Sequence, residues 1–199
     1  MGLTYEDEHV FSNTSFSDFA FSVINRYPNP HAVHIKSIDT LSRSLIPISG
    51  ADNTQHKLKF TRLIRKLGSL PRWTPSVLRI SDSFILETII INPVEKVIDS
   101  RQQNIDHLNF LKVIEVNNYK YNKEKNEVTQ KSKVEFISNI EQYSNKGKTM
   151  WERLSSRVHL GDRIEKFCVN SYHKRIQKSR EGIQWKLEFY KLKNGITAL

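Results

Sequence analysis

The sequence predicts an α+β domain, in which a curved antiparallel sheet of about six to seven strands is combined with a short N-terminal helix and a long C-terminal helix. Apolar and polar residues alternate with a period of two through most of residues 33–138. Turn sequences interrupt this alternation as SGADN, NPVEK and NKEKN. The stretch from Thr149 to Lys193 contains no proline and is rich in Lys, Arg, Glu and Leu, which favours helix.

The first two elements are a strand over residues 4–11 and a helix that begins near Ser15. Asn13, Thr14 and Ser15 can each cap a helix N-terminus. The apolar face of the helix then follows at helical spacing: Phe16, Phe19, Ala20, Val23 and Ile24. The helix must end before Pro28, because proline disfavours helix in the residue that precedes it.

The strands of the predicted sheet follow in sequence order. They cover residues 33–44, 55–67, 83–92, 96–106, 109–122 and 127–138. The final helix covers 149–193, with a break near His159–Gly161. We therefore expect one domain over residues 1–193 and a short tail over 194–199.

The chain of 199 residues carries a formal net charge of +10, and residues 56–80 contain several Lys and Arg but no acidic residue. Such a basic surface fits an anionic partner, which is either a nucleic acid or an anionic membrane, or else solvated Lys and Arg that keep the protein soluble. The single cysteine, Cys168, excludes an internal disulfide and is best interpreted as a small buried hydrophobic residue. No catalytic motif, metal-ligand spacing or phosphate-binding loop occurs, so we expect no enzyme activity, no metal and no cofactor.

Cations on an inward-facing side suggest a cavity. In strand 55–67, Arg62 and Lys66 share one face with apolar residues, and His34 and Lys36 do the same in strand 33–44. Unpaired buried cations are costly, so they need water or an anion. The plainer alternative is that they reach solvent from the sheet edge. Two such strands favour a cavity that is apolar inside and cationic at its mouth.

The last helix and one loop fit this interpretation. The helix passes from an apolar stripe at Ile164 and Cys168 to basic positions at Arg175 and Lys178. The alternative is a helix whose cations complement its dipole. The loop over residues 68–79 is a lid or membrane contact, or else is fixed to the core by its tryptophan. The residues that would serve as lid are Leu70, Arg72, Trp73, Val77 and Leu78. A phospholipid is the ligand class that suits such a cavity.

Four motifs resemble the PRELI-domain family of mitochondrial intermembrane-space lipid carriers: NRYPNP, HIKSIDTLSR, TRLIRKLGSLPRW and KSREG. The resemblance is strongest to the branch that carries phosphatidic acid. It implies a non-enzymatic protein that carries this lipid from the outer to the inner membrane and so supports cardiolipin synthesis. It also implies contact with an anionic membrane and a heterodimer with a small helical partner that has twin cysteine motifs.

The resemblance further implies which residues bind the lipid. The head-group cations would be Arg26, His34, Arg62, Lys66 and Lys178, with Leu70 and Trp73 in the lid. A lysine expected one helical turn before Arg175 is Ser171 here, so we expect Arg175 to supply that charge. A second expected lysine is Ser69, and the segment over residues 138–161 is longer than the family needs.

Two other functions stay open at this stage. A sister branch of the family favours phosphatidylserine, and the changes at Ser69 and Ser171 bear on that choice. A basic nucleic-acid-binding protein is the alternative from another class. The resemblance argues against a nucleic-acid partner.

Overall fold

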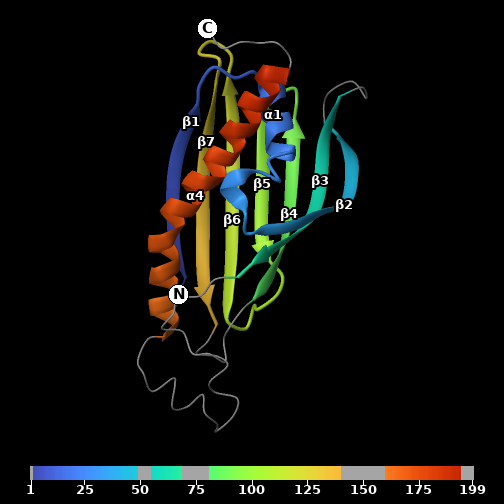
Figure 1. The fold of residues 1–199 in the computed structure, drawn as a ribbon. Coiled ribbons are helices and arrows are strands. Elements are labelled where there is room, and N and C mark those ends of the chain that lie inside the picture. Colours follow the sequence, from blue (N-terminus) through green and yellow to red (C-terminus); the bar gives the residue numbers. More distant parts are fainter. Residues whose placement is uncertain (1, 49–54, 69–80, 140–159, 194–199) are drawn as a thin grey trace.

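One antiparallel sheet contains seven strands in the order β1-β7-β6-β5-β4-β3-β2. The computed structural model describes residues 2–48, 55–68, 81–139 and 160–193. The strands are β1 Leu3–Phe11, β2 Ile35–Pro47, β3 His56–Leu67, β4 Asp82–Asn92, β5 Val97–Asn104, β6 Leu111–Asn122 and β7 Glu127–Ser138. The sheet curves, and the two α-helices of the described residues lie on one face of it (Figure 1). The predicted fold class is therefore confirmed.

The short N-terminal helix, α1, covers Phe16–Ile24. The Ser15 hydroxyl caps it by accepting a hydrogen bond of 3.1 Å from the Asp18 backbone N–H. Its apolar face is buried against Phe11 of β1 and Tyr119 of β6, together with Ile183 and Leu187 of the last helix. The helix ends before Pro28, as the sequence predicted.

The strand that follows begins later than expected. A 3-10 turn, η1, covers Pro30–Ala32, and the Asn29 side chain caps it by accepting from the His31 N–H at 2.9 Å. His34 therefore precedes β2 instead of lying within it. The strand pairing also shifts between Ile35 and Ser37, and Lys36 is exposed. The predicted parity of residues 33–44 was wrong for Lys36, because this irregularity turns its side chain to solvent.

The long helix, α4, covers Leu160–Lys193 and crosses the sheet diagonally (Figure 1). The expected start at Thr149, the break near His159 and the longer segment over 138–161 fall largely or wholly outside the described residues. Two apolar clusters fix α4 to the sheet. One contains Ile183 and Leu187, and the other contains Ile164, Cys168, Tyr172 and Ile176 with Val134 and Phe136 of β7. In the described part of the chain, no helix has the length and hydropathy needed to cross a membrane.

Candidate functional site

A cavity of about 600 Å³ lies between α4 and strands β3 to β7, and the segment from Tyr27 to Ile35 forms another wall. Its volume falls within the range of ligand-binding sites in proteins. The apolar part of the lining includes Ile64, Ile85, Phe110, Leu111, Val113, Phe136, Ile164, Phe167, Cys168 and Ile176. Cys168 is buried within this surface, which confirms its interpretation as a small hydrophobic residue. The cavity can therefore cover apolar chains.

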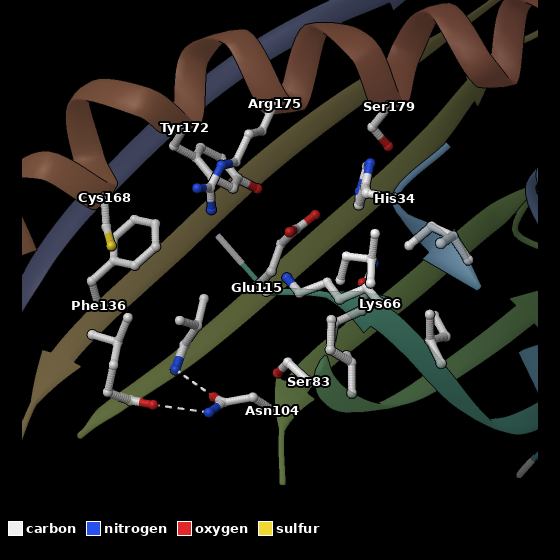
Figure 2. A pocket seen from close by; sticks show the side chains of 18 of the residues that line it. His34, Lys66, Ser83, Asn104, Glu115, Phe136, Cys168, Tyr172, Arg175 and Ser179 are labelled. Carbon is white, nitrogen blue, oxygen red and sulfur yellow. Dashed lines mark hydrogen bonds between the residues drawn. The ribbon is translucent and has the colours of Figure 1, made fainter. Parts of the chain in front are cut away.

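Basic side chains line the same cavity near solvent. His34, Arg175 and Lys178 are exposed, and Lys66 is half-buried. These four residues were predicted as site residues, and the fold brings them together from the end of β3, the turn before β2 and one face of α4. Figure 2 shows the side chains of His34, Lys66 and Arg175 within the pocket. The sequence-based picture of an apolar interior with a cationic mouth matches this geometry.

The electrostatics of the cavity favour an anionic ligand. Loss of water around Lys66 lowers the pKa of its ammonium group, and the positive charge of Arg175 lowers it further. The same two effects lower the pKa of His34, where desolvation comes first and the charges of Lys66, Arg175 and Lys178 follow. A bound phosphate would relieve this repulsion, because its negative charge stabilises the protonated forms.

One acidic residue also lines the cavity, and the sequence analysis missed it. Glu115 lies half-buried on β6, and Figure 2 shows its carboxylate between the ammonium group of Lys66 and the side chains of Tyr172 and Arg175. Its strand carried a usable signal. Val113, Glu115, Asn117 and Tyr119 alternate along β6, so the carboxylate shares its parity with the buried Asn117 and Tyr119.

Arg26 and Arg62 do not line the cavity, although both were predicted to bind the head group. They are buried on either side of Glu87 in an ion cluster. Arg26 also donates to the Val23 carbonyl at 2.9 Å, and Arg62 donates to the Ile24 carbonyl at 2.5 Å. The structure thus corrects the placement of these two cations, because their donors are already bound to protein acceptors.

The predicted lid falls in a segment outside the described residues. Leu70, Arg72, Trp73, Val77 and Leu78 lie outside the described residues, as does Ser69. Leu67 and Gly68, which directly precede them, line the cavity. Ser171, where a lysine was expected, donates its hydroxyl to the Cys168 carbonyl at 3.1 Å and is not part of the lining. Within the described ranges, no group of acidic, His and Cys side chains is suited to hold a metal ion.

Sequence comparison finds a matching protein family and relatives in several organisms. Residues 20–193 match the PRELI-like family. Protein UPS1, mitochondrial, of Saccharomyces cerevisiae is 28% identical over 189 residues, which cover 94% of each chain. The ups1 homolog of Schizosaccharomyces pombe is 27% identical over 181 residues, or 88% of this chain and 90% of that protein. PRELI domain-containing protein 1, mitochondrial, of Gallus gallus is 23% identical and covers 81% of this chain and 66% of that protein.

Solved structures of other proteins share the fold alone. The Zhui aromatase/cyclase from Streptomyces sp. R1128 aligns with a TM-score of 0.55 at 8% identity and covers 94% of both chains. Two of the sequence relatives above are named mitochondrial, which agrees with the location expected from the resemblance. The family match extends over α4 and every strand except β1. This chain belongs to the PRELI-like family.

Proposed function

We propose that the protein is a non-enzymatic carrier that transfers phosphatidic acid between mitochondrial membranes across the intermembrane space. The observation that supports this proposal is the combination of an apolar cavity with the basic residues His34, Lys66, Arg175 and Lys178 at its mouth. The family membership and the mitochondrial names of the relatives support the same role.

The apolar lining answers the main energetic problem of a lipid carrier. Two acyl chains contain roughly 30 methylene groups, and exposing each to water costs about 0.8 kcal/mol. The total of about 25 kcal/mol is far more than thermal energy supplies, so the chains must stay covered during transfer. The cavity between α4 and the sheet is the place where the described residues offer such cover.

The basic rim favours a phosphate monoester as the head group. Lys66, Arg175 and Lys178 approach the cavity from β3 and α4, so their donors can reach several oxygens of one group. A phosphate monoester presents three terminal oxygens to such donors, whereas a phosphodiester presents two. Arg175 supplies a planar pair of donors, and the lysines supply point charges. This match supports phosphatidic acid over phosphatidylserine and supports a lipid over a nucleic acid, because the cations line a cavity.

Two further parts of the proposal come from the family resemblance. We propose that a small helical protein with twin cysteine motifs forms a heterodimer with this chain. We also propose that the lipid delivered to the inner membrane feeds cardiolipin synthesis.

Transfer of fluorescent lipid between two vesicle populations tests the proposal. The donor vesicles contain phosphatidylcholine with either phosphatidic acid or phosphatidylserine, and the acceptor vesicles contain phosphatidylcholine alone. The assay includes the small partner, and a parallel reaction without the carrier measures spontaneous exchange. We expect fast movement of phosphatidic acid and slow movement of phosphatidylserine. Faster transfer of phosphatidylserine would assign the chain to the sister branch, and transfer of neither lipid would reject the carrier function.

A further inference from the structure

Glu115 is the only carboxylate among the described residues that line the cavity. It lies among cations that are expected to bind an anion, and its own charge repels that anion. Figure 2 shows it at the centre of the site, facing Lys66 from one side and Tyr172 and Arg175 from the other. Because its charge would weaken phosphate binding, the presence of Glu115 at this position needs an explanation other than attraction of the phosphate.

A chain of hydrogen bonds that runs through β6, β7 and α4 positions the Glu115 carboxylate. The Asn117 side-chain amide donates to Glu115 Oε1 at 2.8 Å. The Asn117 side-chain oxygen, Oδ1, in turn accepts from Gln130 Nε2 at 3.0 Å and from the Ser132 hydroxyl at 2.6 Å. Arg180 of α4 completes the chain by donating from Nε to Gln130 Oε1 at 3.0 Å. The network fixes the orientation of Glu115, because each member is itself hydrogen-bonded.

A second polar group of the cavity lies beside Glu115. The Tyr172 side chain lines the pocket and is 6% exposed, and its hydroxyl forms no hydrogen bond of ordinary distance and angle within the described part of the chain. Burial, the nearby Glu115 charge and a weak interaction of the hydroxyl with the Glu115 carboxylate raise the pKa of this hydroxyl, so it stays protonated. A buried hydroxyl that is bound only weakly costs free energy that a ligand oxygen can recover. Tyr172 and Glu115 can therefore offer a donor and an acceptor to the same ligand.

Head groups differ in whether they can satisfy this pair. The charged phosphate of a simple phosphodiester has acceptor oxygens only, so no proton would lie between it and the Glu115 carboxylate. A phosphate monoester has a second pKa of about 6, which the Glu115 charge raises and the surrounding cations lower, so its singly protonated form is available near neutral pH. The monoester can thus keep one P–OH group that donates to Glu115, while its other oxygens accept from Tyr172, Arg175 and Lys66.

We propose that Glu115, together with the Tyr172 hydroxyl, is a selectivity subsite that requires a hydrogen-bond donor on the head group beside the phosphate charge. This inference rests on the proposed carrier function and adds the residue that discriminates among anionic lipids. A phosphodiester whose head group has no hydrogen-bond donor is rejected, because its negative charge would face the Glu115 carboxylate with no proton shared between them. An ammonium group on the head group meets the same requirement, so the expected preference for phosphatidic acid over phosphatidylserine comes from the basic rim and not from this subsite.

The test compares extraction of two lipids that differ only in this donor. Phosphatidylcholine vesicles contain either phosphatidic acid or phosphatidylmethanol with the same acyl chains, and lipid bound to the protein is measured after the vesicles are removed. Wild-type protein is compared with Glu115→Gln, whose amide can donate to a phosphodiester oxygen. Glu124→Gln, in the exposed turn between β6 and β7, is the matched control.

We expect wild-type protein and Glu124→Gln to favour phosphatidic acid by at least about tenfold. We expect Glu115→Gln to lose most of that preference, mainly because it extracts more phosphatidylmethanol than wild-type protein does. An unchanged preference in folded Glu115→Gln, or an equal loss in Glu124→Gln, would overturn the inference. Thermal unfolding shows whether the variants are folded. If wild-type protein extracts both lipids equally, the subsite is rejected. If wild-type protein extracts neither lipid, the carrier function itself is rejected.

Discussion

Arg62 donates two hydrogen bonds to one carboxylate oxygen of Glu87, from Nε at 2.8 Å and from Nη2 at 2.5 Å. Arg26 binds the other oxygen of the same carboxylate, and solvent barely reaches any of the three side chains. The two arginines also donate to the carbonyls of Val23 and Ile24 at the C-terminal end of α1. The cluster therefore joins α1 to β3 and β4, and it satisfies carbonyls that the helix leaves free.

Removing the central carboxylate is expected to destabilise the fold. Burial raises the pKa of Glu87, but the two guanidinium groups outweigh this effect, and the pKa falls below its usual value. Glu87→Gln leaves two buried cations without an anion, and we expect a loss of about 3–5 kcal/mol in the free energy of unfolding. Urea denaturation measures the change.

The exposed pair of Arg65 and Asp82, at 3.0 Å, provides the comparison for that experiment. Asp82→Asn should cost less than about 1 kcal/mol, because water screens the pair. Equal costs for Glu87→Gln and Asp82→Asn would show that the buried cluster contributes no more than a surface pair.

The sequence predicted the inward side of Arg62 correctly but not its partner. Alternation along β3 indicates which residues share a face, and this information is local. Glu87 lies directly opposite Arg62 in the pairing of β3 with β4, and such a register depends on contacts between distant segments. The ion cluster therefore could not be predicted from the residue pattern of each strand alone.

The same reasoning explains what could be predicted of the cavity. His34, Lys66, Arg175 and Lys178 were identified because cations interrupt apolar patterns within single elements or match family motifs. Glu115 interrupts its strand in the same way and shares its parity with buried residues, yet an acidic residue on a strand usually faces solvent, and the position of α4 was needed to show that this one lines the cavity. The start of β2 was misplaced because Pro30–Ala32 form a 3-10 turn capped by Asn29, and so short a turn has no periodicity to detect.

Lys66 should contribute to lipid binding and not to folding. Its ammonium group is desolvated and repelled by Arg175, so the empty protein gains no stability from its charge. We expect Lys66→Gln to lower extraction of phosphatidic acid by about 10- to 150-fold, the loss of one charged hydrogen bond of about 1.5–3 kcal/mol. The unfolding free energy should be unchanged or higher.

Lys36→Gln is the matched control for this charge removal, since Lys36 is exposed two residues after His34 and does not line the cavity. Vesicle extraction and urea denaturation are measured on the same preparations. A Lys66→Gln protein that is destabilised by several kcal/mol and binds lipid normally when folded would assign Lys66 a structural role instead.

His34 should make the stability of the empty protein depend on pH. Its folded-state pKa is lowered by desolvation and by Lys66, Arg175 and Lys178, whereas the unfolded chain titrates at about 6.5. Below about pH 6.5 the unfolded state therefore binds more protons, and stability falls as the pH falls toward the folded-state pKa. His34→Gln should reduce this slope, as measured by urea denaturation between pH 7.5 and pH 5.

His9 serves as the comparison because its pKa is lowered by burial and by Arg180, outside the cavity lining. His9→Gln should also reduce the slope. Bound phosphatidic acid should cancel only the contribution of His34, since the phosphate raises the pKa of a histidine that it contacts. If the lipid leaves the slope of His9→Gln unchanged, His34 does not meet the phosphate.

Gly182 of the KSREG motif is expected to be required for the docking of α4. A methyl group at this position would lie 2.5 Å from Asn29 Nδ2 and 2.9 Å from its Cγ. Asn29 cannot move aside freely, because its amide donates to the Arg26 carbonyl at 2.5 Å and accepts from the His31 N–H at 2.9 Å. Helix propensity alone predicts that Gly182→Ala stabilises the protein by about 1 kcal/mol. We expect a net loss of about 1–3 kcal/mol instead, because the methyl group overpacks this contact.

A double-mutant cycle separates the close contact from other effects of the alanine. Asn29→Ala removes the side chain that the new methyl would meet, so the double variant should lose less stability than the sum of the single variants. Gln177→Ala, at an exposed position of α4, should change stability by less than about 0.5 kcal/mol. Because Asn29 caps the turn that leads to His31, Ala32 and His34 of the cavity wall, Gly182→Ala should also slow lipid transfer. Additive single effects, or a Gly182→Ala variant more stable than wild type, would show that the contact relaxes without cost.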